Sequence, residues 1–486
     1  MLGWHEQAES CDCQVIALRC WRNVCNPDRR ENSDVGTQHL TLVGAVFAIA
    51  TLLLMVFRPR WLPALLAASV PFPHTAAVVF LGNGISPFYL LAVVSAIRGA
   101  YLIVRRCLDG RSMPRTWFRH TPIIFIVFGA YSVAISFVGP AVFQGMSVFS
   151  PRGGIDQQVG HMTALTFTIS NIAQPVYLLL GISVVFYLGL EERVNPNVFE
   201  ISVWIGALFA LARLILPAYW PTAVFENMPN VNYSVTQSAL RGTFGEPSMF
   251  GFFIVCGLAF SVATAVFSRG WPRTRTVSAA VLLGIELIFN RSWTAQASIG
   301  LLLIVSLVIL VRHELVRRRV KRLGTSIAVL TLLAVGAAMA PVAFRLVEPK
   351  LQTMSFENRT AADARALEIF LQSWGAGIGL GSNRPSSVVA LLLSCVGIVG
   401  TVAFFSILVF TVTGSIRVRA TSPVGWALLG AAIAEAISVP ELSMPALWML
   451  MGLAAWSVEI RSEKKLVAAA EGQESTTRPT PMETLM

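Results

Sequence analysis

Long apolar runs separated by short polar connections fill most of this chain. A helix that crosses a bilayer needs about 20 apolar residues. Reading for runs of that kind predicts thirteen spans, of which the second, interrupted by Pro71 and Pro73, is the weakest. The predicted spans lie near residues 40–57, 62–81, 86–104, 122–143, 162–189, 198–216, 249–268, 277–291, 296–311, 325–344, 386–412, 423–438 and 443–458.

The predicted fold is therefore an all-α, polytopic integral membrane protein with about 12–13 transmembrane helices. Composition supports this prediction, because hydrophobic residues make up 55% of the chain and charged residues only 13%. A soluble domain cannot bury that much apolar surface. We expect one transmembrane domain over residues 40–458, with tails at 1–39 and 459–486.

Basic residues predict the orientation, because cytoplasmic loops are enriched in arginine and lysine. They gather in four connections that all fall on one side of the predicted membrane: Arg105, Arg106, Arg111, Arg115 and Arg119; Arg269, Arg273 and Arg275; Arg312, Arg317, Arg318, Arg319, Lys321 and Arg322; Arg417 and Arg419. We assign that side to the cytoplasm. The larger loops 217–248 and 345–385 then lie outside.

The two tails are expected to be disordered, with 459–486 in the cytoplasm. By parity of the spans, the N-terminus is expected outside, and the loss of one weak span would move it inside. Cys11, Cys13, Cys20 and Cys25 crowd the N-terminal tail in a spacing that fits no zinc pattern, and a disulfide is possible if that end lies outside.

The segment Arg241-Gly-Thr-Phe-Gly-Glu246-Pro-Ser248 stands out because it is polar and directly precedes a span. Charged groups at a membrane are expensive to bury and usually mark functional sites. Arg241 is a candidate anion ligand, and Glu246 is a candidate general base. For Glu246 the alternative is a helix-start residue beside Pro247, stabilised by the helix dipole.

The loop 345–385 is predicted to contain a short amphipathic helix on the outer membrane surface. It would begin at Thr360-Ala-Ala-Asp363, a capping-box-like sequence, and end at Gly375. The helical spacing of its apolar residues places Arg359 and Asp363 near the apolar stripe, toward the membrane domain. The alternative for these two residues is a plain i,i+4 ion pair. The apolar stripe comprises Leu367, Phe370, Leu371 and Trp374.

A glycine-rich run, Gly375-Ala-Gly-Ile-Gly-Leu-Gly381-Ser-Asn-Arg384, follows this helix. Glycines such as Gly379 and Gly381 allow backbone amides to approach an oxyanion. Arg384, at the mouth of the next span, is either a phosphate ligand or an interfacial anchor.

Arg291 occupies a very short outer turn, Asn-Arg291-Ser-Trp-Thr, and Arg213 lies near the outer end of its own span. For both, snorkelling to lipid headgroups is the alternative to a functional role. Glu286, inside a span, is expected to pair with one of them. Four arginines reaching one face predict a multiply charged anionic ligand, such as a lipid-linked pyrophosphate. They are Arg241, Arg291, Arg359 and Arg384.

Metal and nucleic-acid chemistry find little support in the sequence. Of the six histidines, only His161 is predicted in an external loop of the core, and it has no partner at ligand spacing. No paired aspartates face outside, so neither a metal nor another cofactor is expected. An aromatic-basic platform for nucleic acid is also missing. No internal repeat is visible, which weakens a transporter or flippase interpretation.

At these motifs the chain resembles the superfamily of O-antigen polymerases and O-antigen ligases, over roughly residues 200–415. The matching pieces, in order, are Arg241-Gly-Thr-Phe-Gly-Glu-Pro, Asn-Arg291-Ser-Trp-Thr, Arg359 before the amphipathic helix, Gly377-Ile-Gly-Leu-Gly-Ser-Asn-Arg384 and Val396-Gly-Ile-Val-Gly400.

The resemblance implies a metal-independent glycosyltransferase of the bacterial cytoplasmic membrane with its active site on the external face. Its substrates would be polyprenyl-pyrophosphate-linked oligosaccharides, and its partners membrane lipids and other polysaccharide-assembly proteins. Arg241, Arg359 and Arg291 would hold the pyrophosphate, and Glu246, or less favourably Glu286, would accept the proton of the attacking hydroxyl.

Family ligases carry a histidine in the second large external loop, and none occurs here between residues 314 and 486. This difference favours a polymerase of surface-polysaccharide repeat units over a ligase. The ligase remains the nearest alternative. A flippase of lipid-linked sugars is the alternative from another class.

Overall fold

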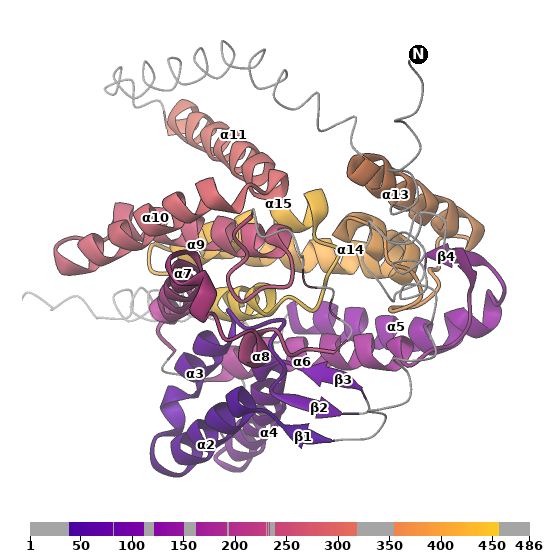
Figure 1. The fold of residues 1–486 in the computed structure, drawn as a ribbon, viewed down its shortest axis with the longest axis horizontal. Coiled ribbons are helices and arrows are strands. Elements are labelled where there is room, and N and C mark those ends of the chain that lie inside the picture. The colour runs from indigo at the N-terminus through magenta and orange to yellow at the C-terminus, as the bar shows by residue number, and fades with distance from the viewer. Residues whose placement is uncertain are drawn as a thin grey trace, which may run out of the picture.

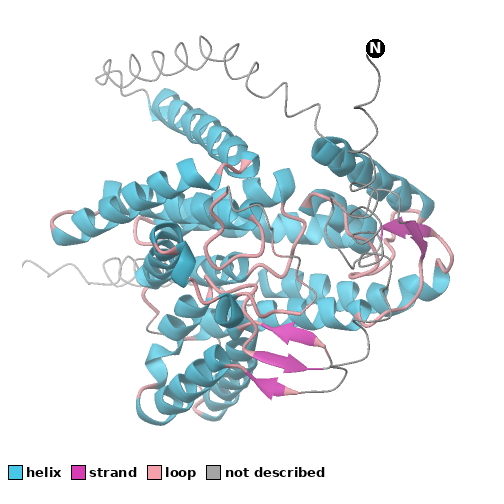
Figure 2. Ribbon diagram, viewed as in Figure 1, coloured by secondary structure: helices cyan, strands magenta, loops and turns pink. Residues whose placement is uncertain are grey.

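The computed structural model describes residues 38–80, 82–110, 121–149, 162–191, 194–229, 231, 233, 239–317 and 354–455. Within these ranges the protein is built almost entirely of helices, with two small groups of short strands (Figures 1 and 2). The predicted span 325–344, His161 and most of the two predicted tails lie outside the described residues.

Among the described residues, six helices are long and apolar enough to cross a membrane. They are α4 (Pro87–Leu108), α5 (Thr121–Val142), α6 (Ser170–Leu190), α7 (Phe199–Ile215, with the preceding 3-10 turn η4, Pro196–Val198), α9 (Pro247–Phe267) and α14 (Val388–Ile416). The prediction of a helical, polytopic membrane protein is confirmed at this level.

The remaining helices are shorter or less apolar than these six. They are α2 (Leu42–Phe57), η2 (Pro59–Trp61), α3 (Leu62–Ser69), η5 (Pro217–Tyr219), α8 (Thr222–Phe225), α10 (Trp271–Asn290), α11 (Trp293–Arg317), α13 (Met354–Gln372), α15 (Ser422–Ser438) and a final helix, Pro445–Ala455.

The second predicted span, 62–81, is wrong as a continuous helix. α3 stops at Ser69 after eight residues, and the chain continues through Pro71 and Pro73 into a strand. Proline removes a backbone donor and disfavours helix in the residue before it, so two prolines so close together end the helix. The weakest of the predicted spans, 62–81, is thus interrupted in the structure.

The strand that follows belongs to an antiparallel sheet of order β1 (His39–Leu40), β2 (Val78–Phe80) and β3 (Asn83–Ile85). This sheet joins the start of α2, the end of the segment returning from α3 and the start of α4. These three points therefore lie at the same end of the molecule. Because α4 runs from there to the arginine-rich connection after Leu108, the sheet lies at the end predicted to be external.

A second pair of strands replaces the first turns of another predicted span. β4 (Ser147–Phe149) pairs with β5 (Met162–Ala164), and α6 begins only at Ser170. The predicted span 162–189 therefore loses its first eight residues to a hairpin and a short connection.

The centre of the bundle is α9, which packs against α10 and α15 (Figure 1). It is apolar on every side, with Phe250, Phe252 and Phe253 fully buried, as expected of a helix surrounded by others. Gly206 of α7 lies directly against Phe253, because a Cβ there would come within 2.4 Å of the ring. This contact lets α7 approach α9 closely.

The short helix predicted in the loop 345–385 is present as α13, but it begins earlier than predicted. Thr360 lies inside it and donates to the carbonyl of Phe356, so the capping-box start at Thr360 is wrong. The helix buries Ala362, Ala366 and Ile369 against the protein. Its opposite side exposes Leu367, Leu371 and Trp374, the arrangement of a helix with one face on protein and one toward lipid.

Candidate functional site

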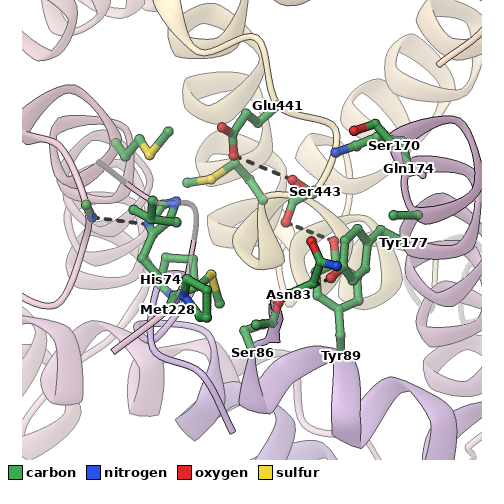
Figure 3. Close-up of a pocket in the computed structure, with 18 of the residues that line it drawn as sticks. His74, Asn83, Ser86, Tyr89, Ser170, Gln174, Tyr177, Met228, Glu441 and Ser443 are labelled. Atoms are coloured by element: carbon green, nitrogen blue, oxygen red, sulfur yellow. Dashed lines mark hydrogen bonds between the residues drawn. The ribbon is translucent and has the colours of Figure 1, made fainter. Parts of the chain in front are cut away.

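A cavity of about 240 Å³ opens at the end of the bundle where α4, α6, α9 and α14 begin and α15 ends. This is the end opposite the arginine-rich connections. The titratable groups in its wall, several of which Figure 3 labels, come from six separate stretches of chain. They are His74, Tyr89, Tyr177, Glu246, Arg384 and Glu441.

An ion pair stands in this wall. Arg384 Nη2 donates to Glu441 Oε1 at 3.1 Å, and the two side chains are 26% and 20% exposed. Arg384 lies just before α14, and Glu441 lies just after α15. Ser443 Oγ donates to the other carboxylate oxygen of Glu441 at 3.5 Å. The pair is thus partly exposed to solvent.

The position of Arg384 is fixed by α13. Asp363 accepts hydrogen bonds from the backbone amides of Ser386 at 2.7 Å and Ser387 at 3.3 Å, at the start of α14. The predicted orientation of Asp363 toward the membrane domain is confirmed, and the alternative ion pair with Arg359 is not formed. A carboxylate at the N-terminus of a helix is also favoured by the helix dipole.

Glu246 lines the same cavity from the N-cap position of α9. Its side chain makes no capping hydrogen bond to the helix backbone, and instead accepts from Ser248 Oγ at 3.2 Å. Pro247 begins the helix, as the sequence predicts, because its missing N–H needs no partner there.

His74 is a cavity residue that sequence reasoning missed. Its Nδ1 accepts from the backbone amide of Gly245 at 3.2 Å, and the side chain is buried. Burial lowers the pKa of His74, and Glu441 partly opposes this effect, while Arg384 and Arg241 reinforce it. The imidazole is therefore neutral at neutral pH and carries its proton on Nε2. Pro71 and Pro73 are the signal that places His74 in a loop rather than a span.

Tyr89 and Tyr177 form the aromatic part of the wall, with ring centroids 4.5 Å apart. Tyr89 donates its hydroxyl to the carbonyl of Ser443 at 2.8 Å. In the sequence they look like ordinary interfacial tyrosines at helix starts. Paired aromatic faces beside hydroxyls and carboxylates provide both the apolar and the polar contacts that a sugar requires.

Arg241 is buried beside the cavity but does not line it. Its Nη2 pairs with Glu226 Oε2 at 2.7 Å, and its Nη1 donates to the carbonyls of Phe244 and Gly245. Glu226 also pairs with Arg213 at 2.5 Å. Arg241 stacks over Tyr233, whose pKa burial raises to about 12.

Arg291 and Arg359 also lie away from the cavity. Arg291 is exposed in the left-handed conformation that ends α10. Arg359 points to the protein as predicted, and it donates to Ser438 Oγ at the end of α15. The predicted convergence of four arginines is therefore wrong for this cavity: among the residues that the structure describes, Arg384 alone of the four lines it.

In the glycine-rich loop the amide of Gly379 and those of its two neighbours are not available to an anion as predicted. The amides of Ile378, Gly379 and Leu380 already donate to Ser394 O, Cys395 O and Ser136 Oγ at 2.8–2.9 Å. A Cβ on Gly379 would lie 2.7 Å from the Ser136 backbone. A Cβ on Gly381 would lie 2.4 Å from the Ser170 carbonyl. Both glycines permit close packing, and Gly381 also borders a second cavity.

Among the described residues, no three His, Cys, Asp or Glu side chains gather so as to hold a metal ion. No protein-family model matches the chain, and no curated protein matches it in sequence. The interpretation of the site therefore depends on its own geometry and on the motifs described above.

Proposed function

We propose that this protein is a membrane glycosyltransferase that polymerises polyprenyl-pyrophosphate-linked oligosaccharide repeat units into a surface polysaccharide. One observation carries the proposal. Two residues of the resemblance motifs, Glu246 and Arg384, line one polar and aromatic cavity at the end of the helices predicted to be external. A lipid-linked donor reaches such a site from the bilayer while its glycan stays in water.

In this proposal Arg384 binds the diphosphate. A guanidinium presents paired donors to phosphate and keeps its charge in a poorly solvated site. Arg241 adds to the positive field from behind the wall, since both guanidiniums act on His74. Charge that develops on the diphosphate as the glycosidic bond breaks is stabilised by these preorganised groups.

The neutral His74 is a hydrogen-bond donor in this scheme and not the base. Its Nδ1 is occupied by the Gly245 amide, so Nε2 carries the proton. The proton of the attacking hydroxyl passes to a carboxylate instead. Glu246 and Glu441 are the two carboxylates in the cavity wall. Glu286 is buried in α10 and lies outside this wall, which removes it as a candidate there.

A ligase is the second candidate, and one observation favours it. A buried histidine lies at the cavity after all, although it comes from the segment before β2 and not from the second large external loop. Both reactions form a glycosidic bond at the expense of a lipid-linked donor. They differ in whether the product can serve again as acceptor.

The test uses the full-length protein purified into lipid nanodiscs. Lipid-linked oligosaccharide is extracted from cells of the source organism in which the gene has been deleted, so that the donor is made but not consumed. A polymerase converts it into a ladder of regularly spaced lengths. A single transfer to an added acceptor would instead indicate a ligase. Movement of the lipid across a bilayer without any new glycosidic bond would indicate a flippase.

A further inference from the structure

A second cavity, of about 130 Å³, lies beside the first. The two share part of their walls, and the ion pair of Arg384 and Glu441 belongs to both. The shared residues are Ser170, Gln174, Tyr177, Arg384, Glu441 and Ser443. The ion pair thus stands on the partition between two adjoining compartments.

The compartments differ in what they can hold. Only the larger is bordered by His74 and Glu246. The smaller is bordered by neither. Among the described residues of its wall, Arg384 is the one basic side chain, and Leu178, Leu391 and Leu442 lie there beside the hydroxyl, amide and aromatic groups. This combination of apolar and polar groups suits one uncharged sugar ring.

Resting on the function proposed above, we infer that the smaller cavity holds the terminal sugar of the acceptor, and that Glu441 is the base that activates it. The donor occupies the larger cavity. The acceptor oxygen attacks the donor's anomeric carbon and forms the new C–O bond. The bond from that carbon to the diphosphate oxygen breaks, and the lipid diphosphate leaves with the electron pair. The acceptor's hydroxyl proton passes to the Glu441 carboxylate.

Geometry favours Glu441 over Glu246 for this role. A base must reach the acceptor hydroxyl at a point where it also faces the donor. Glu441 borders both cavities, whereas Glu246 borders only the larger. In this inference Glu246 binds the donor, a role different from the general base that its motif suggests.

The ion pair couples proton transfer to Glu441 with stabilisation of the leaving diphosphate by Arg384. Before the reaction, Glu441 offsets part of the charge of Arg384 at 3.1 Å. A protonated Glu441 no longer does so. The field of Arg384 therefore strengthens in the same step in which negative charge grows on the diphosphate, so the arginine binds the transition state more tightly than the ground state.

The first experiment compares Glu441→Gln with wild type in nanodiscs, using extracted lipid-linked oligosaccharide as donor and a carrier-free repeat-unit oligosaccharide as acceptor. Glutamine keeps the side chain's size and can still accept from Arg384. We expect kcat to fall about 100-fold or more, the donor KM to stay within a few-fold, and the acidic limb of the pH profile to disappear. Glu368→Gln on α13, where the carboxylate is 58% exposed, should retain full activity.

A second variant tests the subsite without touching the base. Leu391 lines the smaller cavity only, and Leu391→Phe should narrow it. We expect the acceptor KM to rise about 10-fold, which corresponds to ~1.4 kcal/mol, with the donor KM unchanged. If Glu441→Gln cannot be purified in folded form, this variant decides alone, and an unchanged acceptor KM overturns the inference.

The outcomes separate the two proposals. A wild-type protein that forms no glycosidic bond overturns the proposed function itself. An active wild type with full turnover and an intact acidic limb in Glu441→Gln overturns only the assignment of Glu441.

Discussion

Two arginine–glutamate clusters lie near each other in this protein, and they differ in how closed they are to solvent. In the first, Glu226 pairs with both Arg213 and Arg241, and all three side chains are at most 19% exposed. In the second, Arg384 and Glu441 pair at the partition of two cavities and are more exposed. The same residue types form a closed structural cluster in one place and an accessible site in the other.

The surroundings of the first cluster explain its closure. Arg213 lies over Trp220 and Arg241 over Tyr233, and the indole of Trp220 also donates to Glu226 at 3.1 Å. The neighbouring backbone is tied to the segment before β2, because Thr75 donates to Phe225 O and the Ala76 amide donates to Asn227. Every charge in this cluster has partners within it, so we assign the cluster a structural role, in which it holds the loop 217–248 in place.

The largest expected effect comes from breaking the closed cluster. In Glu226→Gln, two buried arginines lose their shared counter-charge, and removal of one partner from a buried ion pair costs about 3–5 kcal/mol. We expect a clear loss of stability against thermal or denaturant unfolding in detergent. Glu368→Gln, which removes an exposed carboxylate, should change stability by no more than about 0.5 kcal/mol. Equal stability of the two variants would contradict the structural role of Glu226.

Arg384→Gln should have little effect on stability and a large effect on polymer synthesis. The pair is partly exposed, so its loss should cost no more than about 1 kcal/mol of stability. Polymer synthesis should fall about 10²–10³-fold, because one preorganised charge at the leaving group is lost. Gel analysis of product and an unfolding curve from the same preparation measure both quantities. A stable variant with normal polymer would remove Arg384 from the mechanism.

Arg359→Lys should have a smaller effect. Arg359 does not line the cavity, but it holds Ser438 at the end of α15, three residues before Glu441. We expect it to act as a positioning residue, with kcat reduced about 3–10-fold, or at most ~1.4 kcal/mol, and the donor KM unchanged. Long polymer at normal levels in a variant that reaches the membrane would exclude even this role.

The smallest effect concerns pH. The folded state lowers the pKa of His74 below its ordinary value of 6.5, so the unfolded chain takes up the proton first as pH falls. Stability is therefore complete above 6.5 and is lost as pH falls from there through the lowered value. His74→Gln should reduce the stability difference between about pH 7.5 and about pH 5. An unchanged difference would show that the imidazole is not held neutral.

The apolar pattern predicted the helices well because a span needs a long, nearly uncharged run and little else. It failed at His74, where two prolines within an apolar stretch were treated as a weak span and not as a break. It also missed the strands, since segments of two or three residues, such as Ser147–Phe149, carry almost no periodic signal.

The candidate site was predicted in part. Glu246 and Arg384 were found from motif and position, and the structure places both at one cavity. The partner of Arg241 could not be found, because Glu226 lies fifteen residues earlier and nothing in the spacing joins them. Glu441 was missed for a similar reason, since a lone glutamate after a span has no local motif. Tertiary contacts decide which carboxylate pairs with each arginine, and the spacing of residues in the sequence does not reveal those contacts.

The most direct test of the account is reconstitution of the purified chain in nanodiscs with extracted lipid-linked oligosaccharide. The account predicts a ladder of polymer from wild type, the same ladder from Glu368→Gln, and almost none from Arg384→Gln of equal stability. A wild-type protein that is folded and supplied with that donor, yet forms no glycosidic bond, would contradict it.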